Sequence, residues 1–187
     1  MAFRFPFARD LIDFGSYFGH SGVDWPGSNV GSGALIPCIG PGTVVDITLN
    51  SVNDPGDHSE PTWRGNSVLV DHGTIDGIGI TTLYAHMIAA PLVGLGSPVT
   101  ELTMLGGVGN SGASSGTHLH VEVIYDGVRL PTSTPGNNTP GLGFQRTLAW
   151  LDAHAGTTPP DPEPTPRGGS RRPAWLNRPP THYYRTW

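Results

Sequence analysis

The stretch GTHLHVEV, residues 116–123, places two histidines two positions apart in an apolar segment and a glutamate two positions after the second one. In a β-strand, side chains two and four positions apart point to the same side, so His118, His120 and Glu122 share one face. Buried imidazole and carboxylate groups need polar partners, so this face is predicted to line a groove or to hold an ion. The histidine pair alone is a weak indication, because half-buried structural histidines are common.

A second pair of potential ligands lies in GHSGVDW, residues 19–25. His20 and Asp24 both suit a borderline divalent cation such as zinc. On a straight strand their side chains would stand roughly 13 Å apart, too far to share one ion, and we expect Gly22 to permit the bend that brings them together. The alternative is a turn with an Asx hydrogen bond and an exposed histidine.

A third histidine, His86, ends an apolar strand in TLYAHMI, residues 82–88. Tyr84, two residues earlier, is expected on the same face of that strand. Three segments that lie far apart in the chain are thus predicted to carry histidines at strand ends or on polar strand faces.

The elements that must position these groups are short. The 187 residues include 27 Gly and 19 Pro, which favours strands and turns over long helices. Partly alternating, β-branched segments predict strands at residues 43–49, 66–72, 80–87 and 118–125. A helix is predicted near residues 142–153, where Phe144, Leu148 and Leu151 share a face. This is the pattern of an all-β domain with one late helix.

Charge and proline content divide the chain into three parts. Residues 1–154 hold 5 Arg against 13 acidic residues and are predicted to form the folded domain. Residues 155–170, AGTTPPDPEPTPRGGS, predict a semi-rigid Pro-rich linker. Residues 171–187 interleave 4 Arg with Trp and Tyr and contain no acidic residue. This basic aromatic tail is predicted either to dock on another protein, an anionic cell-wall polymer or nucleic acid, or to be a disordered, solvated terminus.

No segment reaches 18 consecutive apolar residues, and the opening MAFRFPFARDLIDFGSYF is too polar for a secretory signal. We therefore expect no membrane span. If the protein acts outside a cell, we expect something other than its own signal to deliver it there. Cys38, the one cysteine, lies in the apolar ALIPCIG and is expected to be buried rather than nucleophilic. All ten basic residues are arginine, which suggests a GC-rich genome.

Taken in order, HSGVD (20–24), DHG (71–73), LYAHM (83–87) and GNSGASSGTHLHVEV (109–123) resemble the lysostaphin/LytM-type zinc metallopeptidases. The resemblance covers about residues 19–130 and includes the H-x-x-x-D, Y-x-H and H-x-H motifs in the family's order. It implies a LytM-like fold, an antiparallel β-sandwich or twisted sheet that forms an open groove. In this chain a short C-terminal helix and an extended tail would follow it.

Carried over residue by residue, the resemblance implies that His20, Asp24 and His120 bind Zn²⁺. It also implies that His86 and His118 are unliganded catalytic histidines. Three protein ligands that leave one position open are typical of a catalytic rather than a structural zinc site. The two catalytic histidines would take a proton from water, stabilise the oxyanion and protonate the leaving amine. The sequence does not divide these roles between them.

Other residues are expected around this centre. Glu122 would orient a histidine, or else form a salt bridge or part of the groove wall. Tyr84, Asn110 and Ser114 are candidate supporting or substrate contacts, although turn chemistry explains Asn110 and Ser114 equally well. Loops 50–65 and 106–117 are expected to wall the groove. The remaining histidines are placed outside the site: His72 in a structural role at a strand end, and His58, His154 and His182 in solvent.

The resemblance implies zinc-dependent hydrolysis of peptide bonds in peptidoglycan stems or cross-links, with no nucleic-acid partner. The alternatives are a structural phage tail protein, a non-catalytic LytM-like binding or activator module, and a metallocarboxypeptidase. The presence of all three ligands and both catalytic histidines favours activity. A hydrolase without a secretion signal fits a bacteriophage protein, made in the host cytoplasm and acting at the cell wall. It would be either released at lysis or carried in a virion, where the tail could dock.

Overall fold

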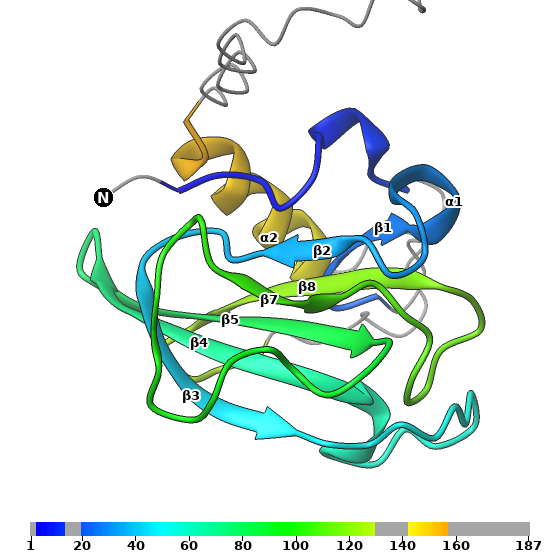
Figure 1. Ribbon diagram of the computed structural model, residues 1–187. Helices are drawn as coiled ribbons and strands as arrows, with labels where there is room; N and C mark the ends of the chain where they lie inside the picture. Colours follow the sequence, from blue (N-terminus) through cyan, green and yellow to red (C-terminus); the bar gives the residue numbers. More distant parts are fainter. Residues whose placement is uncertain (1–2, 14–19, 130–141, 157–187) are drawn as a thin grey trace, which may run out of the picture.

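The strands form two antiparallel sheets, seen in a computed structural model that describes residues 3–13, 20–129 and 142–156 (Figure 1). The larger sheet has six strands in the order β1-β8-β5-β4-β3-β6, and the smaller one pairs β2 with β7. Their bounds are β1 Val23–Pro26, β2 Leu35–Pro37, β3 Gly42–Thr48, β4 Asn66–Ile75, β5 Ile78–Met87, β6 Pro98–Val99, β7 Met104–Gly107 and β8 His118–Tyr125. The helical segments are η1 Arg9–Leu11, α1 Gly27–Val30, η2 Thr62–Arg64 and α2 Leu142–His154.

The prediction of an all-β domain with a late helix is confirmed. The four predicted strands correspond to β3, β4, β5 and β8, and the predicted helix corresponds to α2. The strands β1, β2, β6 and β7 were not predicted from the sequence, and they are two to four residues long. Such short segments cannot display the alternation on which strand prediction depends.

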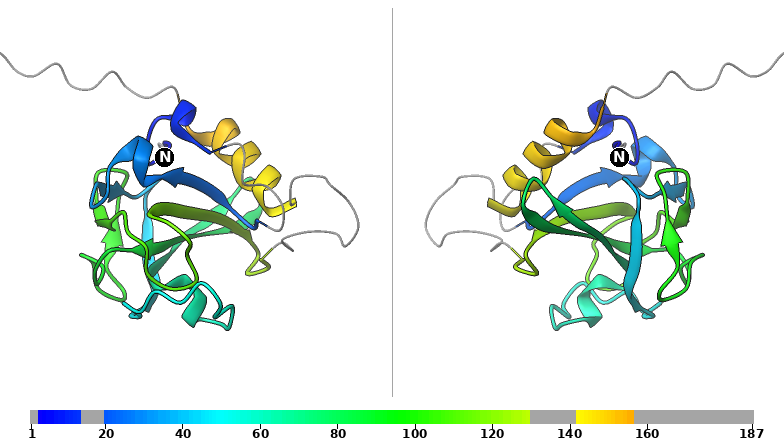
Figure 2. Two further views of the ribbon diagram at one scale, coloured as in Figure 1. Left: turned by 90° about the vertical axis from the view of Figure 1, so that its right-hand side faces the viewer. Right: turned by 90° about the vertical axis from the view of Figure 1, so that its left-hand side faces the viewer.

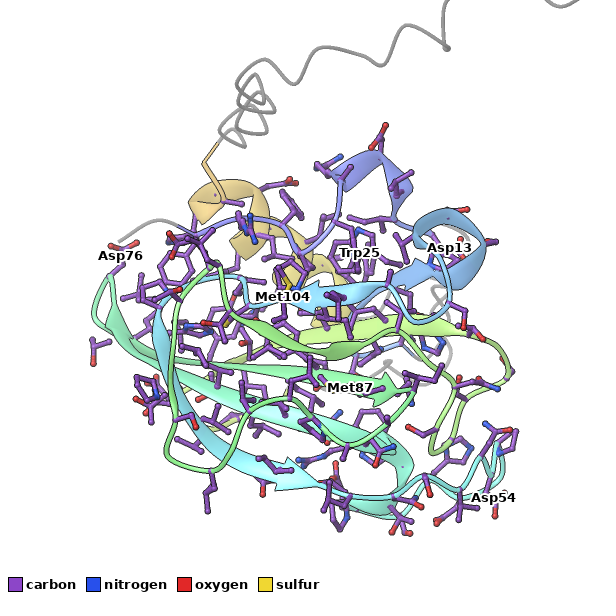
Figure 3. The ribbon with its side chains drawn as sticks, viewed as in Figure 1. Asp13, Trp25, Asp54, Asp76, Met87 and Met104 are labelled. Carbon is purple, nitrogen blue, oxygen red and sulfur yellow. The ribbon has the colours of Figure 1, made fainter. Side chains whose placement is uncertain are left out.

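The main core lies between one face of the large sheet, the small sheet and α2. From β8 it takes Leu119, Val121 and Val123, which alternate with the polar residues of that strand, and from α2 it takes Phe144 and Leu151. Figure 2 shows α2 lying alongside β1 and β8, with the N-terminal segment next to it. Figure 3 shows side chains filling the space between these layers.

The helix α2 covers the edge of β8 beyond Val121, the residue opposite the start of β1. The backbone N–H of Val123 donates to Thr147 Oγ1 at 3.1 Å, so the strand edge gains a side-chain partner in place of a neighbouring strand. The phenol of Tyr125 donates to the Arg146 carbonyl at 3.1 Å. The helix therefore fixes the same strand that carries His118, His120 and Glu122.

The opposite face of the large sheet has few apolar residues. Leu83, Ala85 and Ile124 form a small buried cluster there, with Trp63 and Leu69 packed against it. His120 and Glu122 alternate with Val121 along β8 and so lie on this second face, where His120 pairs in register with Ala85 and Glu122 with Leu83. The sheet thus separates a dry core from a polar face.

Several predictions fall at or beyond the ends of the described residues. Of the predicted linker, only Ala155 and Gly156 are described, and the basic aromatic tail with His182 lies outside the described residues. Within the part of the chain that the structure describes, no helix is long and apolar enough to cross a membrane.

Candidate metal centre

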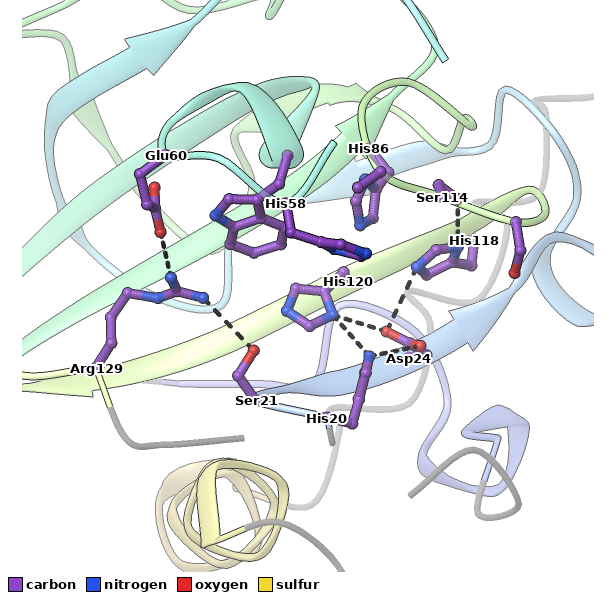
Figure 4. A pocket seen from close by; sticks show the side chains of 13 residues that line it. His20, Ser21, Asp24, His58, Glu60, His86, Ser114, His118, His120 and Arg129 are labelled. Carbon is purple, nitrogen blue, oxygen red and sulfur yellow. Dashed lines mark hydrogen bonds and ion pairs between the residues drawn. The ribbon is translucent and has the colours of Figure 1, made fainter. Parts of the chain in front are cut away.

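His20, Asp24 and His120 converge where β1 lies beside β8. Asp24 of β1 is the register partner of His120 of β8. His20 Nε2 is 3.0 Å from Asp24 Oδ2, and His120 Nδ1 is 3.0 Å from Asp24 Oδ1. The two imidazole nitrogens, His20 Nε2 and His120 Nδ1, are 3.2 Å apart (Figure 4). The structure therefore brings together the three residues that the resemblance implies as metal ligands.

Gly22 lies at a bend, as predicted, and it also permits a close approach to β8. The strand β1 begins only at Val23, so His20 precedes it and the distance estimate for a straight strand does not apply. A Cβ atom on Gly22 would stand 2.3 Å from the Val121 carbonyl oxygen and 2.8 Å from the His120 ring. Glycine is needed here because the His120 imidazole occupies the space that a side chain would take.

The ring nitrogens that face one another carry lone pairs. His20 Nδ1 donates to the Gly22 carbonyl at 2.9 Å, which leaves His20 Nε2 as an acceptor. His120 Nε2 donates to Glu122 Oε1 at 3.0 Å, which leaves His120 Nδ1 as an acceptor. In these neutral tautomers, two lone pairs and the Asp24 carboxylate meet with no donor among them. The set therefore favours a cation, either a proton on His120 Nδ1 or a metal ion.

The pKa directions agree with this need for positive charge. Burial lowers the pKa of His120, but its hydrogen bonds with Asp24 and Glu122 outweigh that effect and raise the pKa to about 9. Burial alone would raise the pKa of Asp24, yet its hydrogen bonds with His120 and His20 hold the pKa well below the usual range. The donor atoms of the three residues lie within 4.8 Å of one another, and two imidazoles with one carboxylate are a donor set that suits zinc. The residues present therefore fit a bound zinc ion.

His86 and His118 form a second pair beside this centre, with ring centroids 4.7 Å apart. Each directs Nδ1 to a backbone carbonyl: His86 to Ser111 at 2.8 Å, and His118 to Gly116 at 2.8 Å. In this tautomer Nε2 is the free acceptor on both rings, and His118 Nε2 is 3.7 Å from Asp24 Oδ1.

Both histidines of this pair are kept neutral near pH 7. Burial, reinforced by the neighbouring His120 and His118, lowers the pKa of His86 to about 3. Burial is also the main cause that lowers the pKa of His118. Two neutral imidazoles with free Nε2 atoms can accept protons beside the metal centre.

The expectation that Tyr84 shares a face with His86 is wrong, because the backbone at His86 departs from the strand conformation. His86 has φ of 61°, in the left-handed region that non-glycine residues rarely adopt. This turn interrupts the alternation of β5 and lets the His86 side chain reach the polar face.

Tyr84 remains on the core face and is fully buried. Its hydroxyl accepts a hydrogen bond from the Ile39 N–H at 2.9 Å, and Cys38 and Thr82 lie next to it. Tyr84 therefore neither lines the cavity nor supports a residue of the metal centre. The predicted burial of Cys38 is confirmed.

Glu122 makes both kinds of contact that were considered for it. One oxygen, Oε1, accepts from His120 Nε2 and from Arg129 Nη2 at 2.5 Å, and it also contacts Ser21 Oγ. The other oxygen, Oε2, accepts from Arg129 Nε at 2.6 Å. Burial would raise the pKa of Glu122, but the hydrogen bonds from His120 and Arg129 hold it well below the usual range. Glu122 is thus a buried carboxylate with four donors.

The sequence analysis did not single out Arg129 or Trp63, and both belong to the site. The Arg129 guanidinium lies 4.7 Å from the Trp63 ring centroid, and Trp63 meets His120 and His86 edge to face at 5.7 and 6.0 Å. The available signal for Arg129 was an isolated arginine just after a strand that carries a buried glutamate. For Trp63 no signal existed in the sequence, because the two histidines that it contacts lie far away along the chain.

The two loops that were expected to wall the groove are tied to each other. Asn53 donates through Nδ2 to the Asn110 carbonyl at 2.7 Å and to the Ser114 carbonyl at 2.8 Å. The Ala113 N–H donates to the Trp63 carbonyl at 2.9 Å. Asn110 Oδ1 accepts from Ser114 Oγ at 2.6 Å. Asn110 is therefore engaged within its own loop, whereas Ser114 also lines the cavity.

A cavity of about 560 Å³ opens over these groups. Its lining residues come from the segment before β1, β1, loop 50–65, the end of β5, loop 106–117, β8 and the turn after β8: His20, Ser21, Asp24, His58, Glu60, Trp63, His86, Ala113, Ser114, Ser115, His118, His120 and Arg129. All five residues implied as metal ligands or catalytic histidines line this one cavity.

The remaining described histidines lie in three different settings. His58 is exposed, as predicted, yet its side chain lines the mouth of the cavity. His72 is buried away from the site, with Nδ1 at 2.8 Å from the Pro41 carbonyl and Nε2 at 2.8 Å from Thr82 Oγ1. His154 is half-buried rather than solvent-exposed, because its ring stacks on Trp150 at 4.4 Å.

The sequence model of peptidase family M23 matches residues 18–131. No curated protein matches the chain at a significant level. Among solved structures, a zinc-containing peptidase from Vibrio cholerae shares the fold with a TM-score of 0.53 and 21% sequence identity, and the match covers 72% of this chain and 40% of that one.

Two further solved structures resemble the chain. The catalytic domain of the antimicrobial peptidase lysostaphin from Staphylococcus simulans is 21% identical, with a TM-score of 0.44, over 67% of this chain and 78% of that one. A variant of the catalytic domain of the prophage-encoded M23 protein EnpA from Enterococcus faecalis is 24% identical, with a TM-score of 0.44, over 63% of this chain and 79% of that one.

Proposed function

This chain belongs to peptidase family M23, and we propose that it is a zinc-dependent endopeptidase that cleaves peptide bonds in the stems or cross-links of peptidoglycan. The observation that carries the proposal is the convergence of His20, Asp24 and His120 beside two neutral histidines in one open cavity. A catalytic centre needs a metal site and adjacent proton acceptors, and this cavity holds candidates for both.

Zinc would be held by His20 Nε2, a carboxylate oxygen of Asp24 and His120 Nδ1. When bound, it would supply the Lewis acidity that activates water and polarises the scissile carbonyl. Glu122 would keep His120 in the tautomer whose Nδ1 lone pair faces the metal, since it accepts the Nε2 proton at 3.0 Å.

His86 and His118 would handle protons. Both rings donate Nδ1–H to fixed backbone carbonyls, so each Nε2 is held in place as an acceptor. One of them would take the proton of the attacking water and pass it to the nitrogen of the leaving amine. In the protonated form, either imidazole would stabilise negative charge on the carbonyl oxygen during attack.

The cavity suits an extended peptide. The side that faces His118 is lined by small residues of loop 106–117, namely Ala113, Ser114 and Ser115. Small side chains let the backbone of a peptide approach the catalytic groups closely. An open groove rather than a closed pocket favours an internal peptide bond over a chain end.

The test is digestion of purified cell walls. Full-length protein is incubated with diaminopimelate-type and with lysine-type walls, with and without a chelator, and the released fragments are identified by mass spectrometry. We expect release of peptide fragments that stops with the chelator and returns with zinc. The absence of chelator-sensitive release from either wall would contradict the proposal.

A further inference from the structure

The guanidinium of Arg129 connects the metal-ligand strand to a groove wall. It donates through Nε and Nη2 to the two oxygens of Glu122, at 2.6 and 2.5 Å, and through Nη1 to Glu60 Oε1. Glu122 has a side chain only 3% exposed, whereas that of Glu60 is 46% exposed. One arginine therefore links a buried carboxylate behind the metal centre to an exposed carboxylate at the cavity mouth.

On the buried side, Arg129 completes the environment of His120. The Glu122 carboxylate must be correctly oriented to accept the His120 Nε2–H, because that bond directs Nδ1 toward Asp24 and His20. A bidentate arginine fixes both the plane and the charge of a carboxylate. Without it, Glu122 would be a buried charge supported only by His120 and Ser21.

On the exposed side, Arg129 holds residues 50–65, here called the wall loop. Its contact with Glu60 and its packing over Trp63 fix the end of the wall loop that lies beside His120. Glu60 is held from the other side by Arg64 Nη2 at 2.7 Å. The other end of the wall loop is fixed by Asn53, which bonds to the loop that positions His86 and His118.

We propose that Arg129 is a positioning residue with two separable effects: it orients the metal ligand His120 through Glu122, and it fixes the wall loop at the metal side of the groove through Glu60 and Trp63. The inference rests on the proposed zinc site and deepens it. It predicts that loss of the contact with Glu122 weakens zinc binding, whereas loss of the contact with Glu60 raises KM.

The first measurement is zinc affinity, obtained by competition with a chromophoric chelator on the full chain. Arg129→Gln is expected to weaken the zinc Kd by about 10–100-fold, the usual range for loss of a group that orients a metal ligand. Arg129→Lys keeps the charge but cannot donate two parallel hydrogen bonds to one carboxylate, so its zinc Kd is expected to lie between those of Arg129→Gln and the wild type. The matched control is Arg9→Gln, which breaks a bidentate pair with Asp152 far from the site and should leave the zinc Kd unchanged.

The second measurement separates the wall loop from the metal. Glu60→Gln removes the negative charge of the exposed partner and leaves the Arg129 contacts with Glu122 in place. We expect an unchanged zinc Kd and an unchanged kcat on a soluble wall peptide, with KM raised by about tenfold through loss of a charge-assisted contact. A fall in zinc affinity as large as that of Arg129→Gln would overturn the division between the two partners.

A purely structural role for Arg129 would have a different signature. The Tm of the zinc-free protein would then be lower for Arg129→Gln than for the wild type, while the zinc Kd stayed at the wild-type value. This result would refute the proposal. If Arg129→Gln does not fold, Arg129→Lys carries the same comparison. If the wild-type protein binds zinc but cleaves no wall peptide, the proposed peptidase activity is refuted. The zinc Kd of Arg129→Gln then still decides whether Arg129 orients His120.

Discussion

At the scale of residues, the two histidines of β8 have different surroundings although they lie two positions apart. His120 lies between the carboxylates Asp24 and Glu122, so its pKa rises to about 9 in spite of burial. Burial lowers the pKa of His118 and outweighs the hydrogen bond with the Gly116 carbonyl, which acts in the opposite direction. The same side chain therefore lies in a negative setting that attracts a cation in one position, and in a desolvated setting that keeps it neutral and able to accept a proton in the other.

Substitution of single histidines tests this division. His120→Ala removes Nδ1 from the ligand set and is expected to abolish stoichiometric zinc binding together with wall hydrolysis. His86→Ala leaves His20, Asp24 and His120 intact and is expected to retain zinc but to lose about 10²–10⁴-fold in kcat, the usual contribution of an acid–base group. Zinc content by atomic absorption and hydrolysis rates check both. Loss of zinc in His86→Ala would show that the ligand assignment is wrong.

At the scale of elements, the site depends on how closely β1 and the segment before it approach β8. Gly22 faces the Val121 carbonyl and the His120 ring at distances that no side chain could tolerate. The pairing of Asp24 with His120 is set by register, so a shift of the β1 segment would displace one ligand relative to another.

Gly22→Ala tests this close approach. The added methyl group would push the β1 segment away from β8, at a cost of about 1–3 kcal/mol in the free energy of unfolding, and the zinc Kd is expected to weaken because His20 and Asp24 move relative to His120. The control is Gly156→Ala, where a Cβ meets nothing within 4 Å. Urea unfolding and chelator competition measure the two effects. Wild-type zinc affinity in Gly22→Ala would contradict this account.

The wall loop is the second element on which the site depends. Its Asn53 side chain bonds to the carbonyls of loop 106–117, and that loop supplies the carbonyls of Ser111 and Gly116 to the two catalytic candidates. The wall loop and loop 106–117 are thus one connected structure around the cavity.

Asn53→Ala is expected to loosen this connection. Because His86 and His118 take their orientation from loop 106–117, hydrolysis is expected to fall about tenfold in kcat/KM, whereas the zinc ligands lie on other segments and the zinc Kd should not change. Steady-state kinetics on a soluble peptide and chelator competition make the comparison. Equal losses in both quantities would indicate general damage to the fold.

At the scale of the whole molecule, histidines that are buried in the neutral form link stability to pH. His72 lies far from the metal centre, between the Pro41 carbonyl and Thr82, and burial lowers its pKa. A histidine whose pKa is lower in the folded than in the unfolded protein binds protons more readily when unfolded. Its contribution to stability is therefore fully present above about pH 6.5 and is lost as pH falls below that value.

His72→Gln tests this linkage in the zinc-free protein, where metal binding does not contribute. The variant is expected to be less stable than the wild type at pH 7, but its free energy of unfolding should fall less between pH 7 and pH 5. The slope difference cannot exceed about 1.4 kcal/mol per pH unit for one proton. Urea unfolding at several pH values supplies the slopes. Parallel slopes would mean that His72 titrates normally in the folded state.

The basic aromatic tail stays a prediction, as does bacteriophage origin. Deletion of residues 171–187 is expected to leave cleavage of a soluble peptide unchanged and to weaken attachment to a cell wall or a virion, because the tail carries 4 Arg and no acidic residue. A co-sedimentation assay with walls, beside peptide kinetics, distinguishes the two effects. Equal loss in both assays would show that the tail is part of the catalytic fold.

The all-β class, the four longer strands, the late helix and the peptidase family could be predicted from the sequence. The short strands could not, because two to four residues carry too little alternation. His20, Asp24, His86, His118 and His120 were predicted as a group from their motifs, and the structure places all five around one cavity. The contacts of Arg129 and Trp63 could not be predicted, because their partners are selected by the paths of loops and not by spacing.

The sequence by itself determined which side chains of β8 face together, since the alternation of a strand is a local property of two consecutive residues. It also determined the family, because that depends on motifs and their order. Only the tertiary structure decided which groups meet across strands and loops. The left-handed backbone at His86 turned its ring to the polar face and left Tyr84 in the core. The turn after β8 brought Arg129 to Glu122, a contact set by how the chain folds back on itself.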